Sequence, residues 1–202
     1  MRKGSCRWVG IALAVAVVCG FSAPAFAQDA AYIGEAKCKT CHNKKDEGEQ
    51  WNKWKAEKHP NALAALSTPK AAEIAKAKGI AKPPAEAPEC LKCHVTAFDA
   101  ASGKAPEAIV PASGVQCEAC HGPGSLHQEE GKKKLFKKDA TAKTAETITK
   151  PDAKTCEKCH NKDNPTFNPE RYTLKDGSKA DFDFEQAYAK IAHPNPKKAA
   201  AK

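Results

Sequence analysis

The sequence Cys-x-x-Cys-His occurs four times in this 202-residue chain. The four copies are Cys38-Lys39-Thr40-Cys41-His42, Cys90-Leu91-Lys92-Cys93-His94, Cys117-Glu118-Ala119-Cys120-His121 and Cys156-Glu157-Lys158-Cys159-His160. Two thiols at this spacing add across the vinyl groups of one haem as thioethers, and the histidine that follows binds the iron. The motifs therefore predict four covalently bound haem c groups and a function in redox chemistry.

Paired cysteines also have other uses. Eight cysteines in a secreted chain could form a disulfide scaffold, and two Cys-x-x-Cys pairs could bind zinc through four thiolates. A thioredoxin-like redox motif would need a surrounding βαβ pattern, which the sequence does not show. None of these uses requires a histidine directly after the second cysteine in all four copies, so haem attachment is favoured.

The other histidines are candidate distal ligands of the haem irons. They are His59, His127 and His193, and the chain's single methionine is Met1. Methionine ligation is therefore excluded, and three haems are expected to be bis-histidine, low-spin and low in potential. His127 follows the third motif across a tight turn and is expected to reach a different haem, whereas His193 is expected to reach the haem of His160. Seven histidines leave one axial position to water, hydroxide, a lysine amine or nothing.

The N-terminus has the pattern of a secretory signal peptide, predicted to span residues 1–27. Positive residues precede an apolar run over Val9–Val18 that is too short to span a bilayer comfortably, and Ala25-Phe26-Ala27 fits a cleavage site. Cleavage there would remove Cys6 and Cys19 and leave every remaining cysteine in a haem motif. The mature protein is expected in the periplasm, without stable membrane insertion.

Residues 28–196 are expected to form one tetrahaem cytochrome c domain, followed by a disordered tail over 197–202. The formal net charge of the chain is +9, of which three charges lie in the leader. About eight haem propionates would bring the holoprotein much closer to neutrality. This charge balance, together with the compartment, argues against a nucleic-acid partner.

The elements that position the motifs are expected to be helices and long loops. Helical patterns cover residues 47–66, interrupted at Pro60, and residues 69–78, with Gly79 as the stop. A third helix over Asp183–Ile191 would deliver His193 at its end. Since large apolar residues are few, the haems must supply much of the core. The predicted fold class is a mainly α, small multihaem cytochrome c fold wrapped around four haems, with little or no β-sheet.

A run of basic residues lies at Lys132–Lys138, interrupted by Leu135 and Phe136. It is either a docking patch for an acidic redox partner or a solvated basic loop. The sequence leaves both interpretations open.

Three segments carry a family resemblance. They are Tyr32-Ile33-Gly34 before the first motif, Trp51 to His59 followed by an Ala-Leu run, and the block from Gly114 to His127 with its Gly-Pro-Gly-Ser-x-His ending. With these features the chain resembles the tetrahaem cytochrome c-554 family, electron acceptors for hydroxylamine oxidation in ammonia-oxidising bacteria. Similar proteins occur in metal- and sulfur-reducing bacteria, so the resemblance leaves the donor and acceptor open.

The resemblance also implies a pairing of ligands: His42 with His127, His121 with His59, and His160 with His193, while His94 has no protein partner. The implied function is electron transfer between a donor oxidoreductase or cytochrome and a downstream acceptor, with no catalytic residue. The alternative is reduction of nitric oxide or hydroxylamine at a five-coordinate haem on His94.

Overall fold

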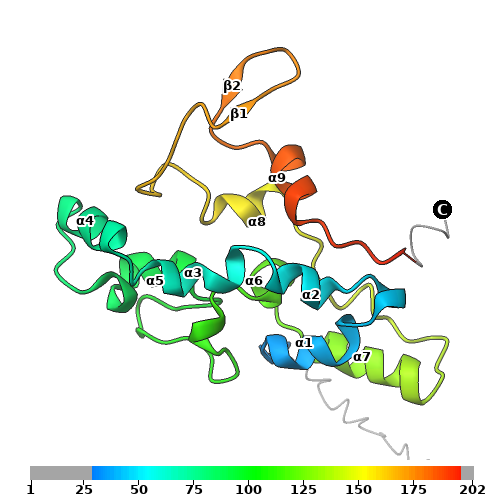
Figure 1. Ribbon diagram of the computed structural model, residues 1–202. Helices are drawn as coiled ribbons and strands as arrows, with labels where there is room; N and C mark the ends of the chain where they lie inside the picture. Colours follow the sequence, from blue (N-terminus) through cyan, green and yellow to red (C-terminus); the bar gives the residue numbers. More distant parts are fainter. Residues whose placement is uncertain (1–28, 197–202) are drawn as a thin grey trace, which may run out of the picture.

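The computed structural model describes residues 29–196, so the predicted signal peptide and C-terminal tail lie outside the described residues. This part of the chain is mainly helical, as the sequence predicts (Figure 1). The helices are α1 (Glu35–His42), α2 (Gln50–Lys55), α3 (Ala62–Ala65), α4 (Pro69–Ala77), α5 (Pro88–His94), α6 (Cys117–His121), α7 (Ser125–Phe136), α8 (Ala153–Glu157) and α9 (Phe184–Ile191), with short 3₁₀ turns η1 (Lys45–Glu47), η2 (His59–Asn61), η3 (Pro84–Glu86) and η4 (Pro111–Ser113). Within residues 29–196, no helix is both long and apolar enough to cross a bilayer.

The helices are arranged in three tiers (Figure 1). Helices α4, α5, α3, α6 and α2 run in a row across the middle of the view, and α1 and α7 lie below its right half. Above the row lie α8, α9 and a small antiparallel hairpin. Its strands β1 (Tyr172–Thr173) and β2 (Lys179–Ala180) pair Tyr172 with Ala180 and Thr173 with Lys179.

Two predicted helices are confirmed, and each begins after a residue whose side chain caps it. Helix α4 begins at Pro69, and the Thr68 hydroxyl accepts a hydrogen bond from the Ala71 amide at 3.3 Å. Helix α9 begins after Asp183, whose carboxylate accepts from the Gln186 amide at 2.8 Å. In both cases a side chain pairs an amide that the first turn of a helix leaves without a partner.

Other segments differ from the sequence-based expectation. Residues 47–66 form short pieces rather than one interrupted helix, because the carbonyl of His59 accepts from the Val115 amide at 3.0 Å instead of continuing a helix. Residues 125–136 form α7, a helix that the sequence did not predict. The small hairpin agrees with the expectation of little or no β-sheet.

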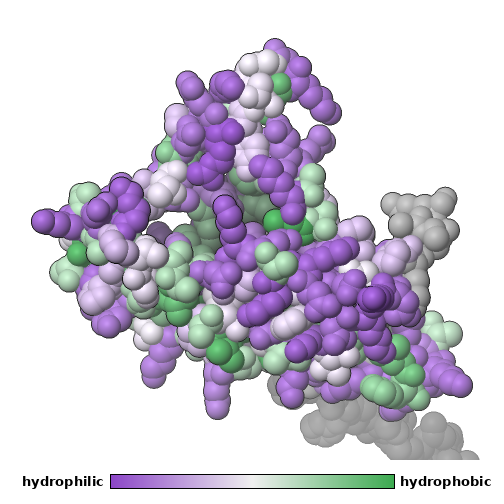
Figure 2. Space-filling model, in the orientation of Figure 1, coloured by the Kyte–Doolittle hydropathy of each residue, from purple (hydrophilic) through white to green (hydrophobic). Residues whose placement is uncertain are grey.

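The buried apolar core of the described residues is small. Its buried hydrophobic residues are Trp54, Leu66, Ala75, Ala87, Val95 and Ile109. The space-filling view shows a hollow between the upper tier and the middle row, with hydrophobic surface inside it (Figure 2). A chain of this size normally buries far more apolar surface, so a large apolar ligand in this region would complete the core.

Candidate haem centres

Each Cys-x-x-Cys-His motif lies on a helix or at its end. The first three end α1, α5 and α6, and the fourth begins in α8. The fourth motif keeps helical hydrogen bonding as far as its histidine, since the His160 amide donates to the Cys156 carbonyl at 2.9 Å. Helical residues three and four apart share a face, so both thiols and the imidazole of a motif can reach one flat ring.

The fourth motif is held by a capping box at the start of α8. The Asp152 carboxylate accepts from the Thr155 amide at 2.8 Å, and the Thr155 hydroxyl accepts from the Asp152 amide at 3.4 Å. This reciprocal pair fixes the first turn directly before Cys156. The helix therefore begins at a defined residue although it is very short.

Six of the seven histidines meet in pairs of rings. The rings of His42 and His127 have centroids 6.0 Å apart and planes 19° apart. Those of His121 and His193 are 6.0 Å apart at 67°. Those of His59 and His160 are 6.2 Å apart at 85°. Each pair therefore joins one motif histidine to one histidine outside the motifs.

The spacing of these pairs fits a metal ion between the rings. An imidazole nitrogen binds a metal at about 2.0–2.1 Å and lies about 1 Å from its ring centroid, so two rings on opposite sides of one iron have centroids roughly 6 Å apart. Rotation of a ring about the nitrogen–iron axis leaves this distance unchanged, so all three plane angles are compatible with axial ligation. The described residues therefore fit haem iron at three positions.

Hydrogen bonds orient five of the imidazole rings through Nδ1. His94 donates to the Ala62 carbonyl at 2.6 Å, His121 to that of Thr149 at 2.9 Å, His127 to that of Thr144 at 2.8 Å, His193 to that of Ile191 at 2.8 Å, and His42 to the Gln50 side-chain oxygen at 3.4 Å. An acceptor at Nδ1 fixes the tautomer and leaves Nε2 as the metal-binding nitrogen. The sequence could not indicate these acceptors, because four of the five are backbone carbonyls.

Burial also favours the neutral imidazole that a metal requires. It lowers the pKa of His42, His59, His160 and His193 below the ordinary histidine value. A protonated imidazole cannot bind a metal, so these four rings are held in the binding-competent form at neutral pH.

His59 is held in place by the segment that leads into the third motif. The His59 carbonyl accepts from the Val115 amide, and the Val115 carbonyl accepts from the indole of buried Trp54 at 2.9 Å. Gly114 has a φ of +57°, and a Cβ there would lie 2.6 Å from the His59 carbonyl oxygen. Only glycine permits this approach, so Gly114 is a positioning residue that sequence patterns alone did not identify.

The ring contacts correct part of the expected ligand pairing. The structure places His127 beside His42, as the resemblance implies, but His193 lies beside His121 and His59 beside His160. His193 cannot turn back to the fourth motif because the residues after it are tied to η1.

Two contacts near residue 196, the last described residue, hold this segment against η1 and Gly48. The Asn195 amide donates to the Glu47 carboxylate at 2.7 Å, and a Cβ on Gly48 would lie 2.5 Å from the Pro194 carbonyl oxygen. This close approach of backbone to backbone brings His193 next to α6 rather than α8.

His94 differs from the other six histidines. Among the described residues no second histidine ring lies against it, and its Nδ1 bond to Ala62 is the shortest of the five. Within residues 29–196 no second imidazole therefore lies opposite His94, which is the arrangement that the resemblance implies.

The motifs themselves meet in two pairs. The thiols of Cys38 and Cys117 lie within hydrogen-bonding reach, which raises the pKa of Cys38 and lowers that of Cys117. The thiols of Cys93 and Cys159 also lie within hydrogen-bonding reach of each other, and this contact lowers the pKa of Cys93 to about 7. First and third motifs are therefore neighbours, as are second and fourth. In residues 29–196 no three His, Cys, Asp or Glu side chains are grouped as a direct metal cluster.

One residue inside the third motif has a structural role that the motif alone does not reveal. The buried carboxylate of Glu118 accepts from the amides of Ile33 at 2.9 Å, Gly34 at 2.8 Å and Gly124 at 2.7 Å. Charge-assisted bonds of this kind are stronger than neutral ones. Glu118 therefore joins the segment before the first motif to the turn after the third.

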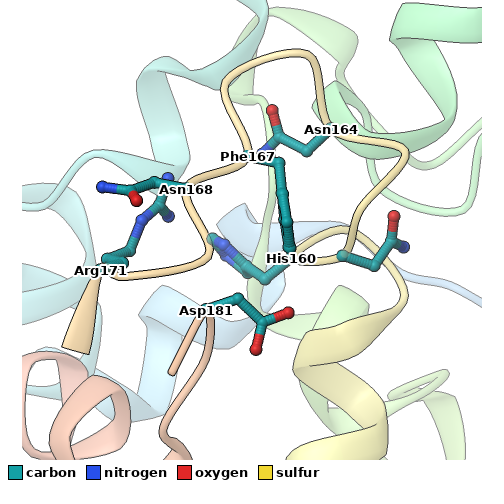
Figure 3. A pocket seen from close by; sticks show the side chains of 7 residues that line it. His160, Asn164, Phe167, Asn168, Arg171 and Asp181 are labelled. Carbon is teal, nitrogen blue, oxygen red and sulfur yellow. The ribbon is translucent and has the colours of Figure 1, made fainter. Parts of the chain in front are cut away.

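A small pocket lies beside His160, between the fourth motif and the hairpin (Figure 3). Phe167 and Asp181 lie on either side of His160 in this view, with Asn168 and Arg171 to one side. The ring of Phe182 also stacks on His160, with centroids 6.0 Å and planes 18° apart. Aromatic and polar side chains therefore surround the imidazole of the fourth motif.

Comparison with known proteins agrees with this geometry. Residues 37–122 match the family described as "Cytochrome c554 and c-prime". Over these residues, somewhat less than half of the chain, the protein is similar to that family. It is also 36% identical over 107 residues to cytochrome c-554 of Nitrosomonas europaea, a match that covers 51% of this chain and 43% of that relative. No solved structure matches the chain.

This similarity supports covalently bound haem c at the Cys-x-x-Cys-His motifs within residues 37–122. The matched residues contain the first three motifs and His59, whereas the fourth motif, His127 and His193 lie beyond them. The chain spans less than half of the cytochrome c-554 relative's length. The ring pairs are therefore independent support for the region that the family match does not reach.

Proposed function

We propose that this protein is a periplasmic electron carrier that holds four haem c groups and passes low-potential electrons between a donor oxidoreductase or cytochrome and a downstream acceptor. The observation that carries the proposal is the set of three histidine pairs at the spacing of axial iron ligands. When bound, each haem supplies an iron that accepts and releases one electron.

The chain's own residues have separate roles in this proposal. The eight motif cysteines attach the haems: Cys38, Cys41, Cys90, Cys93, Cys117, Cys120, Cys156 and Cys159. The motif histidines His42, His94, His121 and His160 are the proximal ligands, and the distal ligands are His127, His193 and His59 on the first, third and fourth haems. Bis-histidine ligation keeps these haems low-spin and low in potential, because it favours ferric iron.

The contacts between motifs support transfer within one molecule. The Cys38–Cys117 and Cys93–Cys159 contacts bring the attachment points of two haems together in each case. A rigid scaffold that fixes neighbouring redox groups needs no motion between transfers. The predicted leader over residues 1–27 supports the periplasm as the compartment in which attachment occurs.

The test is to express the full chain with a c-type haem attachment system and to measure haem content and potential together. Mass spectrometry and the pyridine haemochrome should give four haems per chain, and spectroelectrochemistry should show four one-electron steps. Fewer than four attached haems, or haems that do not cycle reversibly, would overturn the proposal.

A second function rests on His94. Since no histidine ring lies opposite it among the described residues, its haem offers a position at which nitric oxide or hydroxylamine could bind and be reduced. Consumption of either molecule by the reduced holoprotein, measured against a haem-free control, tests this. The absence of consumption would leave electron transfer alone.

A further inference from the structure

The C-terminal end of α7 exposes apolar side chains in a strongly basic setting. Leu135 is 52% and Phe136 78% exposed. We call the following residues the α7 patch: Lys132, Lys133, Lys134, Leu135, Phe136, Lys137 and Lys138. In Figure 2 hydrophobic surface emerges between hydrophilic atoms at the lower right, where Figure 1 places the end of α7.

The local structure leaves most of the lysine charge of the α7 patch unneutralised. Lys133 pairs with Glu130, and Lys132 donates to the Gln128 side chain at 3.2 Å. Among residues 29–196, Lys134, Lys137 and Lys138 form no ion pair. Exposed lysines need no partner. The aromatic ring of Phe136 among them, however, stays exposed on folding and so contributes little hydrophobic stabilisation.

The α7 patch lies on the same helix as a candidate haem ligand. His127 is in the first turn of α7 and Phe136 ends it, so the two lie about 14 Å apart along the helix axis at 1.5 Å per residue. His127 itself lies beside His42. A molecule docked on the patch would therefore sit one helix length from the first haem centre.

We propose that the α7 patch is the docking surface for an acidic redox protein, an inference that rests on the proposed electron-transfer function. An apolar, aromatic centre with a charged rim is the usual anatomy of a transient protein interface. The lysine rim would steer a partner of opposite charge and raise the rate of association, and Phe136 would pack against its surface.

A protein partner suits the α7 patch better than a membrane surface. A helix that lies on a bilayer needs a continuous apolar face. The remainder of α7 is Ser-Leu-His-Gln-Glu-Glu-Gly, in which two glutamates and a ligand-type histidine interrupt any such face. The apolar surface is confined to two adjacent residues, which matches the size of an interface anchor.

The experiment measures electron transfer to the haem-loaded full chain by stopped flow. The probe is reduced plant-type ferredoxin, an acidic one-electron donor, with a neutral flavin semiquinone as the uncharged reference. We expect the variant Lys134→Gln/Lys137→Gln/Lys138→Gln to lower the second-order rate constant with ferredoxin about tenfold at low ionic strength, and to flatten its salt dependence. Phe136→Ser should lower the rate constant while keeping the salt dependence.

The matched control removes three exposed lysines elsewhere: Lys76→Gln/Lys78→Gln/Lys82→Gln, on and after α4. It changes the net charge equally and should alter the ferredoxin rate constant less than about twofold. If both triple variants change the ferredoxin rate constant equally, the α7 patch is not the docking surface. The proposal also fails if the patch variant loses binding to phosphatidylglycerol vesicles while its ferredoxin rate constant is unchanged. Failure of the flavin to reduce the wild-type haems would instead overturn the electron-transfer function.

Discussion

The imidazole planes of His42 and His127 lie 19° from parallel, whereas those of His121 and His193 cross at 67°. Both pairs have the same centroid separation of 6.0 Å. The two sites therefore share a ligand set and a spacing but differ in the relative rotation of their ligands.

This difference predicts two kinds of low-spin ferric spectrum in the haem-loaded protein. Near-parallel axial imidazoles give a rhombic electron paramagnetic resonance signal, and near-perpendicular ones give a signal with a large maximum g value. We expect one rhombic low-spin signal from the His42–His127 haem and two of the second kind from the other pairs. His127→Ala should remove the rhombic signal alone, and Glu129→Ala, on the exposed side of α7, should change nothing. Loss of a different signal in His127→Ala would contradict the assigned pair.

The haem on His94 is expected to bind carbon monoxide when reduced. Because no histidine ring faces His94 among the described residues, one haem in four should bind the gas. His59→Ala should open a second site on the haem of His160, while Asn61→Ala in the same turn serves as the control. Spectral titration counts the sites. Wild-type protein with no binding site would show that another group, such as a lysine amine, occupies the position.

The contact between Gly114 and His59 predicts a specific cost for Gly114→Ala. The new methyl group would lie 2.6 Å from the His59 carbonyl oxygen and 2.9 Å from that of Pro60, so the turn that carries His59 must move. We expect destabilisation of more than about 2 kcal/mol and a high-spin signal from the displaced ligand.

Gly103→Ala is the matched control for that variant. Gly103 also has a positive φ, +69°, but nothing lies within 4 Å of the position that a methyl group would take there. This substitution should cost about 1 kcal/mol of backbone strain and leave the haem spectra unchanged. Urea unfolding measures the loss of stability in both variants, and electron paramagnetic resonance reports their haem ligands. Equal losses of stability with unchanged spectra would show that Gly114 does not position His59.

Glu118→Gln should destabilise the protein although it removes no haem ligand. The amide side chain keeps one acceptor oxygen, so at least one of the amides of Ile33, Gly34 and Gly124 loses its partner. We expect a loss of about 1–3 kcal/mol in unfolding free energy, measured by urea titration of the haem-loaded protein. Glu89→Gln, at an exposed position beside the second motif, is the control. Equal stability of the two variants would refute the anchoring role.

The sequence was most informative where chemistry requires a fixed spacing. The four motifs, the mainly helical fold and helices α4 and α9 followed from local patterns. A count of histidines left one haem without a distal histidine, and the resemblance placed that haem on His94. The partners of His59 and His193 did not follow from the sequence, because they depend on long-range contacts through Val115 and Glu47 that no local pattern encodes. Helix α7 was missed because its polar sequence has no apolar stripe.

The distal histidines have a consequence for how the chain is tied together. His42 meets His127, His59 meets His160 and His121 meets His193, so the three spans overlap along the sequence instead of following one another. An iron within each pair would act as a cross-link, and each cross-link shortens the loops available to the unfolded chain. Because the three cross-linked spans overlap, the chain cannot unfold one span at a time from either end. The haem-loaded protein should therefore lose its structure in a single step, and the third centre can be completed only after α9 has been synthesised.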